Sequence, residues 1–471
     1  MSFKKLTVFL FLIFFVLENL SSQTYTSNGY PVYSDAEIEL RIKNLSGLAV
    51  TPQLDRVVKS YIKTYSVLKR DKTERMLGKL VMYFPLFEKY LMENGMPSDI
   101  KYLSVVESAL NPVAKSRVGA GGLWQFMPAT GKEYGLRITS RLDERSDPHK
   151  STKAAIKYLK RLHNKYQNWE LALAAYNSGP GRVNRAIRRG RSRDFWRIKK
   201  YLPKETRNYV PAFVAANYIV NNYHLHHLNP QYPELDLQLT DHTKVYQSIS
   251  FREISDITGA PIYILEALNP SYKQGVIPSS RNGHYLILPS RNMSAFLAAF
   301  PSPDRVNVAP SGRQEYFKSV YYVQPGDNMA KLANLFDCDS RHIMAWNNLP
   351  QPYLSRGQEL TVYQISTSAN IKVKEISSIK PSIKEKPALK EETVLSTSSN
   401  KKNKTQKTPT SQKTIIPKKD VYIYHYIRRN ESIIDIVEKY PGVNIQDILR
   451  LNQIDGNNFP SVGSRLKIKK M

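Results

Sequence analysis

Glu107 is the residue of this chain whose type and surroundings best suit acid catalysis. It lies in the segment YLSVVESALNPVAKSRVGAGGLWQFMP, residues 102–128. Ile100, Leu103 and Glu107 are spaced to share one face of a helix. We expect this helix to end at Asn111-Pro112. A carboxyl group on an apolar face loses hydration, which raises its pKa and suits it to protonate a glycosidic oxygen near neutral pH.

The residues that follow Glu107 favour a sugar site beside it. For a lone glutamate, a half-exposed side chain paired with Lys101 or Lys115 is the commoner case. Here, however, the glycine cluster at 119–122 lets backbone approach another group closely. The amide of Gln125 follows, among side chains that suit hydroxyl groups and pyranose faces. These neighbours are Trp124, Phe126 and Met127, and the alternative that they are ordinary core stays open.

A second polar pair lies at the end of an apolar helix expected over Trp169–Tyr176. Glycine and proline at 179–181 stop that helix and leave Tyr176 and Asn177 at its end. The hydroxyl and amide groups could face a substrate. The alternative is a core tyrosine and a capping asparagine, which the local sequence alone favours.

Taken together, these motifs resemble the catalytic domain of lytic transglycosylases. The matching segments are Glu107-Ser108, Gly122–Pro128, Ala175–Gly179 and Glu205–Pro211. Their order and spacing are similar to the membrane-bound lytic murein transglycosylase D group of the soluble lytic transglycosylase superfamily, over roughly residues 75–225. The resemblance implies a lysozyme-like, mostly helical domain.

The resemblance also implies chemistry with a single acid. Most glycosidases pair two carboxylates about 5–10 Å apart, whereas only Glu107 lies on an apolar face in this segment. Glu133 and Asp143 have turn-like, polar surroundings, and Asp147 precedes a proline. By resemblance, Glu107 protonates the oxygen between N-acetylmuramic acid and N-acetylglucosamine, while the substrate's acetamido group helps to stabilise the oxocarbenium-like centre. Glu107 then draws the proton from the muramic C6 hydroxyl, which closes a 1,6-anhydro ring without water.

The substrate contacts are carried over from the same resemblance. They are Ser116 and Gln125 for the acetamido and sugar groups, Tyr176 as a hydrogen-bond partner near the acid, Met127 and Asn177 as lining, and Tyr209 as the tyrosine that closes the site. Trp124 stands where many relatives of the soluble type have methionine, so its role as a sugar platform stays open.

The start of the chain predicts an export signal at residues 1–22. Lys4-Lys5 precedes the apolar run Leu6–Leu17, and Ser21-Ser22 gives a small-residue exit. The run is shorter than the ~20 residues that span a bilayer, so a retained anchor is the alternative. The only cysteine is Cys338, which excludes a lipid on a cysteine after the signal and an internal disulfide. We expect a periplasmic or envelope protein that is not a lipoprotein.

Helical spacing continues on both sides of the core segment. We expect a helical lead-in at 23–74 that packs on a catalytic domain at 75–228. The helical patterns cover Asp35–Lys43, Gln53–Leu68, Glu74–Leu91, Ser151–Tyr166 and Glu205–Asn222. Pro85 should start or kink a helix within the third of these.

Three later segments share an extended start, two helices and an extended finish, which predicts a module array. Residues 320–363 and 421–469 resemble LysM modules, whose βααβ fold binds glycans that contain N-acetylglucosamine. The first keeps a Pro-Gly-Asp turn, whereas the second has Arg429-Asn430-Glu431 in its place. Residues 245–290 resemble a degenerate copy without that turn, so glycan binding there stays open.

Residues 366–419 are rich in Lys, Ser, Thr and Pro and predict a disordered linker. The chain carries a net charge of +29, to which these lysines contribute. They favour contact with acidic envelope components, or else a solvated spacer. We expect no nucleic-acid partner, because the chain has an export signal and lacks a basic-aromatic stacking pattern.

The sequence of 471 residues therefore predicts a multidomain α+β protein. A mostly α, lysozyme-like catalytic domain precedes small βααβ LysM modules joined by flexible linkers. We expect a monomeric peptidoglycan lytic transglycosylase, associated with the envelope or outer membrane. A scaffold with little or no turnover and a hydrolytic muramidase are the alternatives. We expect no cofactor and no metal, because only His224 and His227 of the histidine tract could share a helix face and closed sites need about four ligands.

Overall fold

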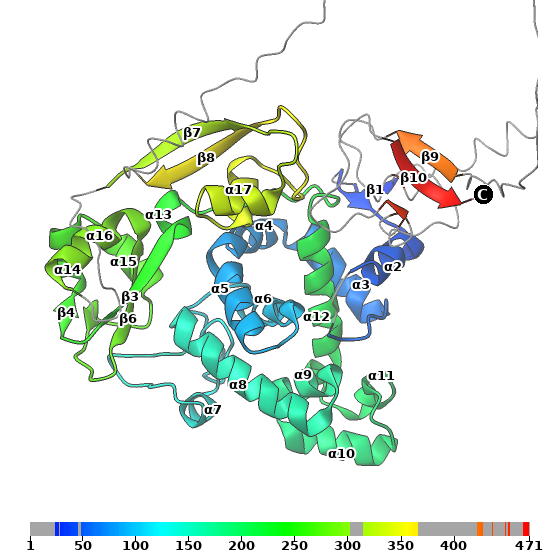
Figure 1. Ribbon diagram of the computed structural model, residues 1–471. Coiled ribbons are helices and arrows are strands. Elements are labelled where there is room, and N and C mark those ends of the chain that lie inside the picture. The colour runs from blue at the N-terminus through cyan, green and yellow to red at the C-terminus, as the bar shows by residue number, and fades with distance from the viewer. Residues whose placement is uncertain are drawn as a thin grey trace, which may run out of the picture.

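A computed structural model of the chain describes residues 24–27, 29–45, 49–301, 314–365, 422–426, 436, 448, 451–452 and 465–470 (Figure 1). The export signal predicted at 1–22, the linker predicted at 366–419 and most of the module predicted at 421–469 lie outside these ranges. Within the described ranges, every helix is too short or too polar to cross a bilayer.

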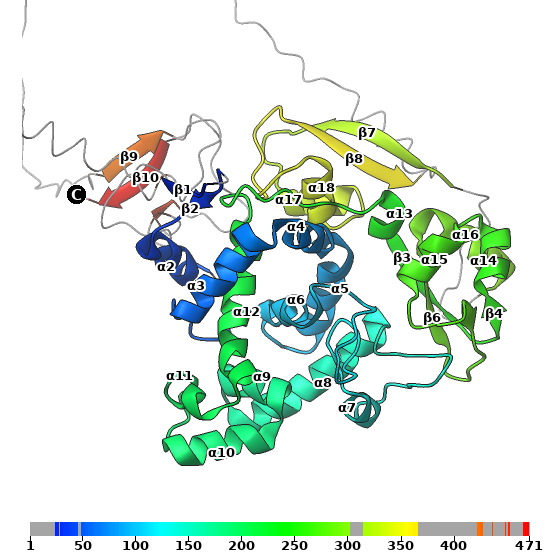
Figure 2. The ribbon, with the colours of Figure 1, turned by 180° about the vertical axis from the view of Figure 1, so that it is seen from behind.

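The first half of the described chain is helical and forms one core. Its elements are β1 (Thr24–Tyr25), β2 (Pro31–Val32), α2 (Asp35–Lys43), α3 (Arg56–Lys63), the π-helical η1 (Thr64–Leu68), α4 (Arg70–Gly78), α5 (Leu80–Glu93), the 3₁₀ turn η2 (Ser98–Tyr102), α6 (Leu103–Ser108), α7 (Pro128–Glu133), α8 (Pro148–Tyr166), α9 (Trp169–Ser178), α10 (Pro180–Gly190), α11 (Phe195–Ile198), the 3₁₀ turn η3 (Lys199–Tyr201) and α12 (Lys204–Asn222). Figures 1 and 2 show α12 between α2 and α3 on one side and α5 and α6 on the other.

Helix α12 is the centre of this core because its mostly apolar residues 209–219 are buried on every side. Val210, Phe213 and Ala216 are fully buried, in one cluster with Val58 of α3 and Phe87 of α5. A helix that is hydrophobic all round must be covered by other elements. The lead-in helix α3 and helix α5 therefore bury their apolar faces against the same helix.

Helix α5 runs through Pro85, and the interruption comes earlier, at Lys79. Proline lacks the N–H that would bond the carbonyl of Val81, so it removes one bond of the ladder. The preceding helix α4 ends at Gly78, where a Cβ atom would come within 1.7 Å of the Gln231 carbonyl oxygen. Backbone packs closely against Gly78 at this boundary, whereas the sequence pattern predicted that a helix would start or kink at Pro85.

The second half of the described chain consists of small antiparallel sheets, each accompanied by helices. The first unit contains α13 (Leu235–Gln238), β3 (Thr240–Val245), β4 (Ile249–Ser250), α14 (Phe251–Thr258), α15 (Ile262–Leu268), β5 (Val276–Ile277), β6 (His284–Pro289) and α16 (Ser290–Ala299). The second contains β7 (Tyr316–Tyr322), α17 (Met329–Leu335), α18 (Ser340–Trp346) and β8 (Glu359–Ile365), and the third contains β9 (Tyr422–Tyr426) and β10 (Arg465–Lys470). In each unit the first and last long strands pair antiparallel.

In each of the three units, an asparagine of its own is hydrogen-bonded to the last strand. Asn347 accepts a hydrogen bond from the Thr361 backbone N–H at 2.7 Å and donates to the Thr361 carbonyl at 2.8 Å. Asn269 makes the same pair of bonds with Ile287, and Asn452 makes them with Lys467. Because these amides satisfy backbone groups at the strand, the repeated Leu-Asn and Trp-Asn pairs of the sequence have a structural role.

The unit that contains β7 and β8 packs directly against the helical half of the chain. Arg341 of α18 places one guanidinium nitrogen 2.5 Å from both carboxylate oxygens of Glu88 on α5. Glu88 also accepts a 2.5 Å bond from Lys101, and Trp346 donates to Gln238 at 3.0 Å. These contacts hold this unit in place by side-chain pairing, whereas the linker predicted at 366–419 lies outside the described residues.

Replacement of Arg341 by Leu should release this unit from α5. Glu88 would keep Lys101 alone, and we expect a loss of about 1–3 kcal/mol in unfolding free energy with faster amide hydrogen exchange in α18. Arg356→Leu, at an exposed position of the same unit, is the control and should change stability by less than about 0.5 kcal/mol. Unchanged exchange in α18 and α5 of Arg341→Leu would show that the pair does not hold the unit in place.

Candidate functional site

Glu107 stands in the last turn of the short helix α6, where the chain reverses direction. The helix ends in two successive left-handed residues, Ala109 at φ 49° and Leu110 at φ 58°. The Ser108 hydroxyl donates to the Leu123 carbonyl at 3.0 Å and so ties the helix end to the glycine-rich segment. The helix therefore ends at Ser108, a few residues before the end predicted at Asn111-Pro112.

The Glu107 carboxyl is largely withdrawn from water and has no basic partner among the described residues. Its Oε1 accepts a short hydrogen bond from the Tyr209 hydroxyl. Burial raises the pKa of Glu107 to about 8; the Tyr209 bond opposes this shift, and the negative charge of Glu205 adds to it. The side chain is nevertheless partly exposed, so it can meet a molecule in solution. An acid that keeps its proton at neutral pH and remains accessible is what proton donation requires.

The tyrosine bonded to the acid is Tyr209 rather than Tyr176, which the resemblance had placed next to it. The Tyr176 hydroxyl donates instead to the Trp124 carbonyl at 2.8 Å. Tyr176 lies near enough for the charge of Glu107 to raise the pKa of its phenol, after burial as the larger cause. The three side chains therefore form one cluster, with Tyr209 in contact with the acid and Tyr176 holding the backbone beside it.

Gln125 and Ser116 hold the glycine-rich segment in shape. Gln125 has a left-handed backbone at φ 47°, and its side-chain Nε2 donates to the carbonyls of Ala114 and Gly122 at 3.1 and 2.9 Å. The Ser116 hydroxyl oxygen accepts from the Ala120 N–H at 3.0 Å. Both side chains thus shape the loop, and a substrate contact for either stays a prediction.

The remaining sequence-predicted residues divide between core and surface. Trp124 is fully buried and donates to Thr152 at 2.9 Å, so its ring belongs to the core and is not a sugar platform. Met127 is 42% exposed. Asn177 accepts a 2.7 Å bond from Thr206 and donates to Glu205 at 3.3 Å, which links the end of α9 to the start of α12.

Arg145 is hydrogen-bonded to the backbone of the glycine-rich segment. This residue was not identified from the sequence. Its guanidinium donates to the carbonyls of Gly119 and Phe126 at 2.7 and 3.1 Å and pairs with Asp143 at 2.8 Å. A Cβ atom on Gly122 would come within 1.8 Å of the Arg145 carbonyl oxygen. Gly122 is therefore required by the close approach of the Arg145 backbone to the loop.

Glu205 is the carboxylate whose charge reaches Glu107, and it too was missed as a functional candidate. It lies one helical turn before Tyr209 on α12, a spacing that places both on one face. The other acidic residues considered from sequence have other partners. Asp143 pairs with Arg145, Asp147 caps α8, and Glu133 pairs with Arg161.

Comparison with known families assigns most of the described elements. Residues 84–199 match the transglycosylase SLT domain, and residues 239–303 match the LysM-like domain of lytic transglycosylase MltD. Residues 321–363 and 425–469 match the LysM domain. These matches confirm the predicted fold class, a helical SLT domain followed by modules with small antiparallel sheets.

Several curated proteins are similar to this chain. It is 27% identical over 391 residues to membrane-bound lytic murein transglycosylase D of Escherichia coli K12, covering 80% of this chain and 74% of that protein. It is 33% identical over 141 residues to soluble lytic murein transglycosylase of the same strain, covering 28% of this chain and 22% of that protein.

Among solved structures, the 70 kDa soluble lytic transglycosylase SLT70 of Escherichia coli is 30% identical, with a TM-score of 0.27. The match covers 30% of this chain and 24% of that one, so this chain spans about a quarter of its length.

Replacement of Gly122 by Ala should destabilise the loop beside Glu107. The added methyl would collide with the Arg145 backbone, and φ at Gly122 is +83°, so we expect a loss of about 2–4 kcal/mol in a urea unfolding experiment. Gly119→Ala is the matched control: φ is +88°, but nothing lies within 4 Å of its Cβ position, so it should lose about 1 kcal/mol. Equal losses in the two variants would show that the contact with Arg145 is unimportant.

The raised pKa of Glu107 predicts a pH dependence of stability. Between its ordinary value of 4.5 and its folded value of about 8, the folded protein holds a proton that the unfolded chain releases. The stability gained this way is complete below the unfolded pKa and is lost as pH rises through the folded pKa. The unfolding free energy of the wild type, relative to Glu107→Gln, should fall by on the order of 2–4 kcal/mol between about pH 5 and 8. Parallel stability curves for the two proteins would contradict the shift.

Proposed function

We propose that this chain, a lytic murein transglycosylase built from an SLT domain and LysM modules, cleaves peptidoglycan glycan with Glu107 as its single acid and base. The observation that carries the proposal is the environment of Glu107. Burial raises its pKa to about 8, and its hydrogen-bond partner is a tyrosine rather than a cation. Near neutral pH such a carboxyl group is protonated and can act as the general acid.

The first step is proton transfer to the bridging oxygen. Glu107 gives its proton to the oxygen between N-acetylmuramic acid and N-acetylglucosamine while the bond from that oxygen to the muramic C1 breaks. Positive charge then develops at C1, and the substrate's acetamido group shares it. The Tyr209 hydroxyl remains hydrogen-bonded to the Glu107 carboxylate left behind and stabilises its new charge.

The second step returns the proton. The Glu107 carboxylate removes the proton of the muramic C6 hydroxyl, and the freed oxygen bonds to C1. A 1,6-anhydro ring closes, Glu107 regains its starting state, and no water is consumed. Ser116, Gln125, Met127, Asn177 and Tyr176 are the proposed positioning and lining residues, since they belong to the loop and helix ends around the acid.

The LysM modules bind peptidoglycan, and the protein acts in the cell envelope. We propose that residues 1–22 direct its export to the periplasm, where the modules keep the SLT domain on its polymer. Because the modules and the SLT domain are linked, binding of a module to a glycan strand raises the local concentration of the SLT domain at that strand. The contact between α18 and α5 gives the module of residues 316–365 a fixed position relative to the catalytic helices.

A hydrolytic muramidase is the second candidate, because Glu205 lies near the acid. In hydrolases a second carboxylate activates water or attacks the sugar. Glu205 is exposed and accepts a hydrogen bond from Asn177. The proposed lyase chemistry instead uses its charge to keep Glu107 protonated.

Product analysis distinguishes these functions. Purified murein sacculi incubated with the wild type should release fragments with 1,6-anhydro ends, identified by mass spectrometry. Glu107→Gln should lower the rate by at least about 10³-fold, because glutamine cannot donate and recover the proton. Glu133→Gln, at an exposed glutamate paired with Arg161, is the control and should keep full activity.

The other products would identify the alternatives. Fragments with reducing ends would establish a muramidase. The absence of any fragments from the wild type would leave a binding scaffold.

A further inference from the structure

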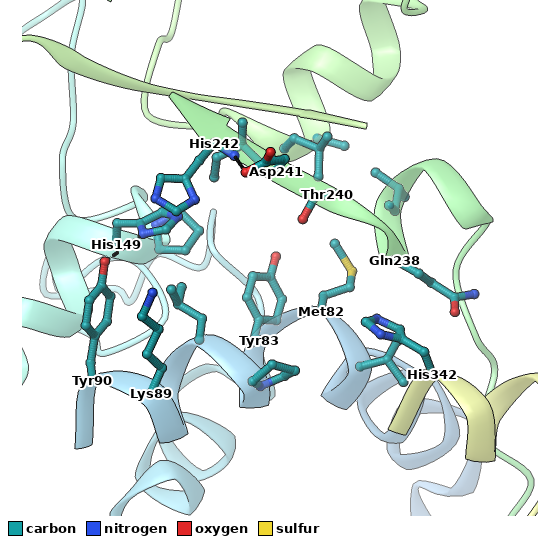
Figure 3. A pocket seen from close by; sticks show the side chains of 18 residues that line it. Met82, Tyr83, Lys89, Tyr90, His149, Gln238, Thr240, Asp241, His242 and His342 are labelled. Atoms are coloured by element: carbon teal, nitrogen blue, oxygen red, sulfur yellow. Dashed lines mark hydrogen bonds between the residues drawn. The ribbon is translucent and has the colours of Figure 1, made fainter. Parts of the chain in front are cut away.

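A cavity of about 260 Å³ lies where three units of the chain meet, and the proposed chemistry does not use it. One wall is the outer face of α5, and the opposite wall is β3 with the end of α13 (Figure 3). His149 at the start of α8 closes one side, and His342 of α18 closes the other. A cavity of this size holds a molecule about as large as a dipeptide or one sugar ring.

One buried polar side chain, that of Tyr83, presents its polar atom to this cavity. Tyr83 is only 6% exposed, and among the described residues its hydroxyl has no hydrogen-bond partner. Figure 3 shows that hydroxyl pointing away from α5 into the cavity. His342 is 7% exposed, and its two ring nitrogens are enclosed rather than open to the cavity, near backbone carbonyls of Gln238 and Val81 that favour its charged form. Buried polar groups are normally satisfied, so the Tyr83 hydroxyl marks a position in the cavity where a ligand atom or a water molecule can bond.

The charged and titratable groups around the cavity are distributed unevenly. Lys89 is exposed at the α5 side, and Figure 3 shows it extending toward His149. His149 bonds the Tyr90 hydroxyl at 2.9 Å and lies 4.3 Å from His242, ring centre to ring centre. Burial lowers the pKa of His149 to about 3, so the His149 imidazole is neutral. The carboxylate of Asp241, on β3, accepts the His242 backbone N–H.

Apolar side chains supply most of the remaining wall. They are Val81, Met82, Leu86, Leu237, Leu268 and Ile287. A ligand that fits must therefore combine small apolar groups with a few hydrogen-bonding groups, and it should carry an anion at the Lys89 side. A pyranose has hydroxyl groups around its whole edge, and several of them would face apolar wall and stay unpaired.

We propose that this cavity binds a short peptide with small apolar side chains and a free carboxylate, with the Tyr83 hydroxyl bonding one of its amide groups and Lys89 its carboxylate. The assignment of such a peptide rests on the proposed function, because the peptide stems of peptidoglycan belong to this chemical class. The site contacts α5, β3 and α18 together, so the bound peptide would hold the three units in one arrangement.

The test uses the full chain carrying Glu107→Gln, so that binding is measured without turnover. Acetyl-D-alanyl-D-alanine, its carboxamide and N-acetylglucosamine are titrated separately and followed by saturation-transfer NMR and calorimetry. We expect the free acid to bind and the carboxamide to bind about tenfold more weakly, because it lacks the charge that Lys89 pairs with.

Three further substitutions localise the peptide. Lys89→Gln should lower affinity for the acid about tenfold and abolish the difference between acid and carboxamide, whereas Lys157→Gln, at an exposed lysine of α8 outside the cavity, should change neither. Tyr83→Phe should weaken both peptides about fivefold. Its melting temperature should not fall, because the removed hydroxyl has no partner in the described chain.

Several results would overturn the proposal. One is no saturation transfer to the peptide at millimolar concentration, which would leave a cavity filled by water. Another is stronger binding of N-acetylglucosamine, or peptide binding that Tyr83→Phe and Lys89→Gln leave unchanged. Because this test needs no catalysis, it is separable from product analysis: anhydro fragments without peptide binding would reject the cavity assignment alone, and peptide binding without anhydro fragments would reject the lyase alone.

Discussion

The protonation state of Glu107 is set by the loss of water around its carboxyl group. Its hydrogen-bond partner is a tyrosine hydroxyl and not a cationic side chain. Burial favours the protonated form, and the nearby charge of Glu205 acts in the same direction. Had a lysine or arginine paired with Glu107, as Lys101 and Arg341 pair with Glu88, the carboxyl would be ionised at neutral pH. The protonated state of Glu107 therefore depends on the exclusion of water and of a cationic partner as much as on the nearby charge of Glu205.

The rest of the catalytic helices hold this environment in place. Tyr209 and Glu205 come from α12, whose buried surface also receives the lead-in helix α3. The loop opposite them is fixed by Arg145, by the turn at Gly122 and by the Gln125 amide. A shift of α12 or of the loop would admit water to Glu107 and lower its pKa, so packing far from the acid contributes directly to its proton affinity.

Sequence reasoning succeeded where a pattern has a local physical cause. The apolar stripe ending at Glu107 predicted its burial, and the repeated Leu-Asn and Trp-Asn pairs marked the modules that Asn347 and its counterparts hold together. Sequence reasoning failed where tertiary contacts determine the backbone conformation or the partner of a side chain. The left-handed residues Ala109 and Leu110 have no glycine to indicate them. Likewise, only the folded chain shows that Tyr209 contacts the acid and that Trp124 is core.

Direct titration of Glu107 tests the central claim. Carbon-13 NMR of protein labelled at glutamate side-chain carboxyls, compared between the wild type and Glu107→Gln, identifies the resonance that belongs to this residue. We predict that it titrates with a midpoint near 8, the value that burial gives it in the folded protein. A midpoint near its ordinary 4.5 would mean that the carboxyl is ionised at neutral pH and would contradict its role as the proton donor.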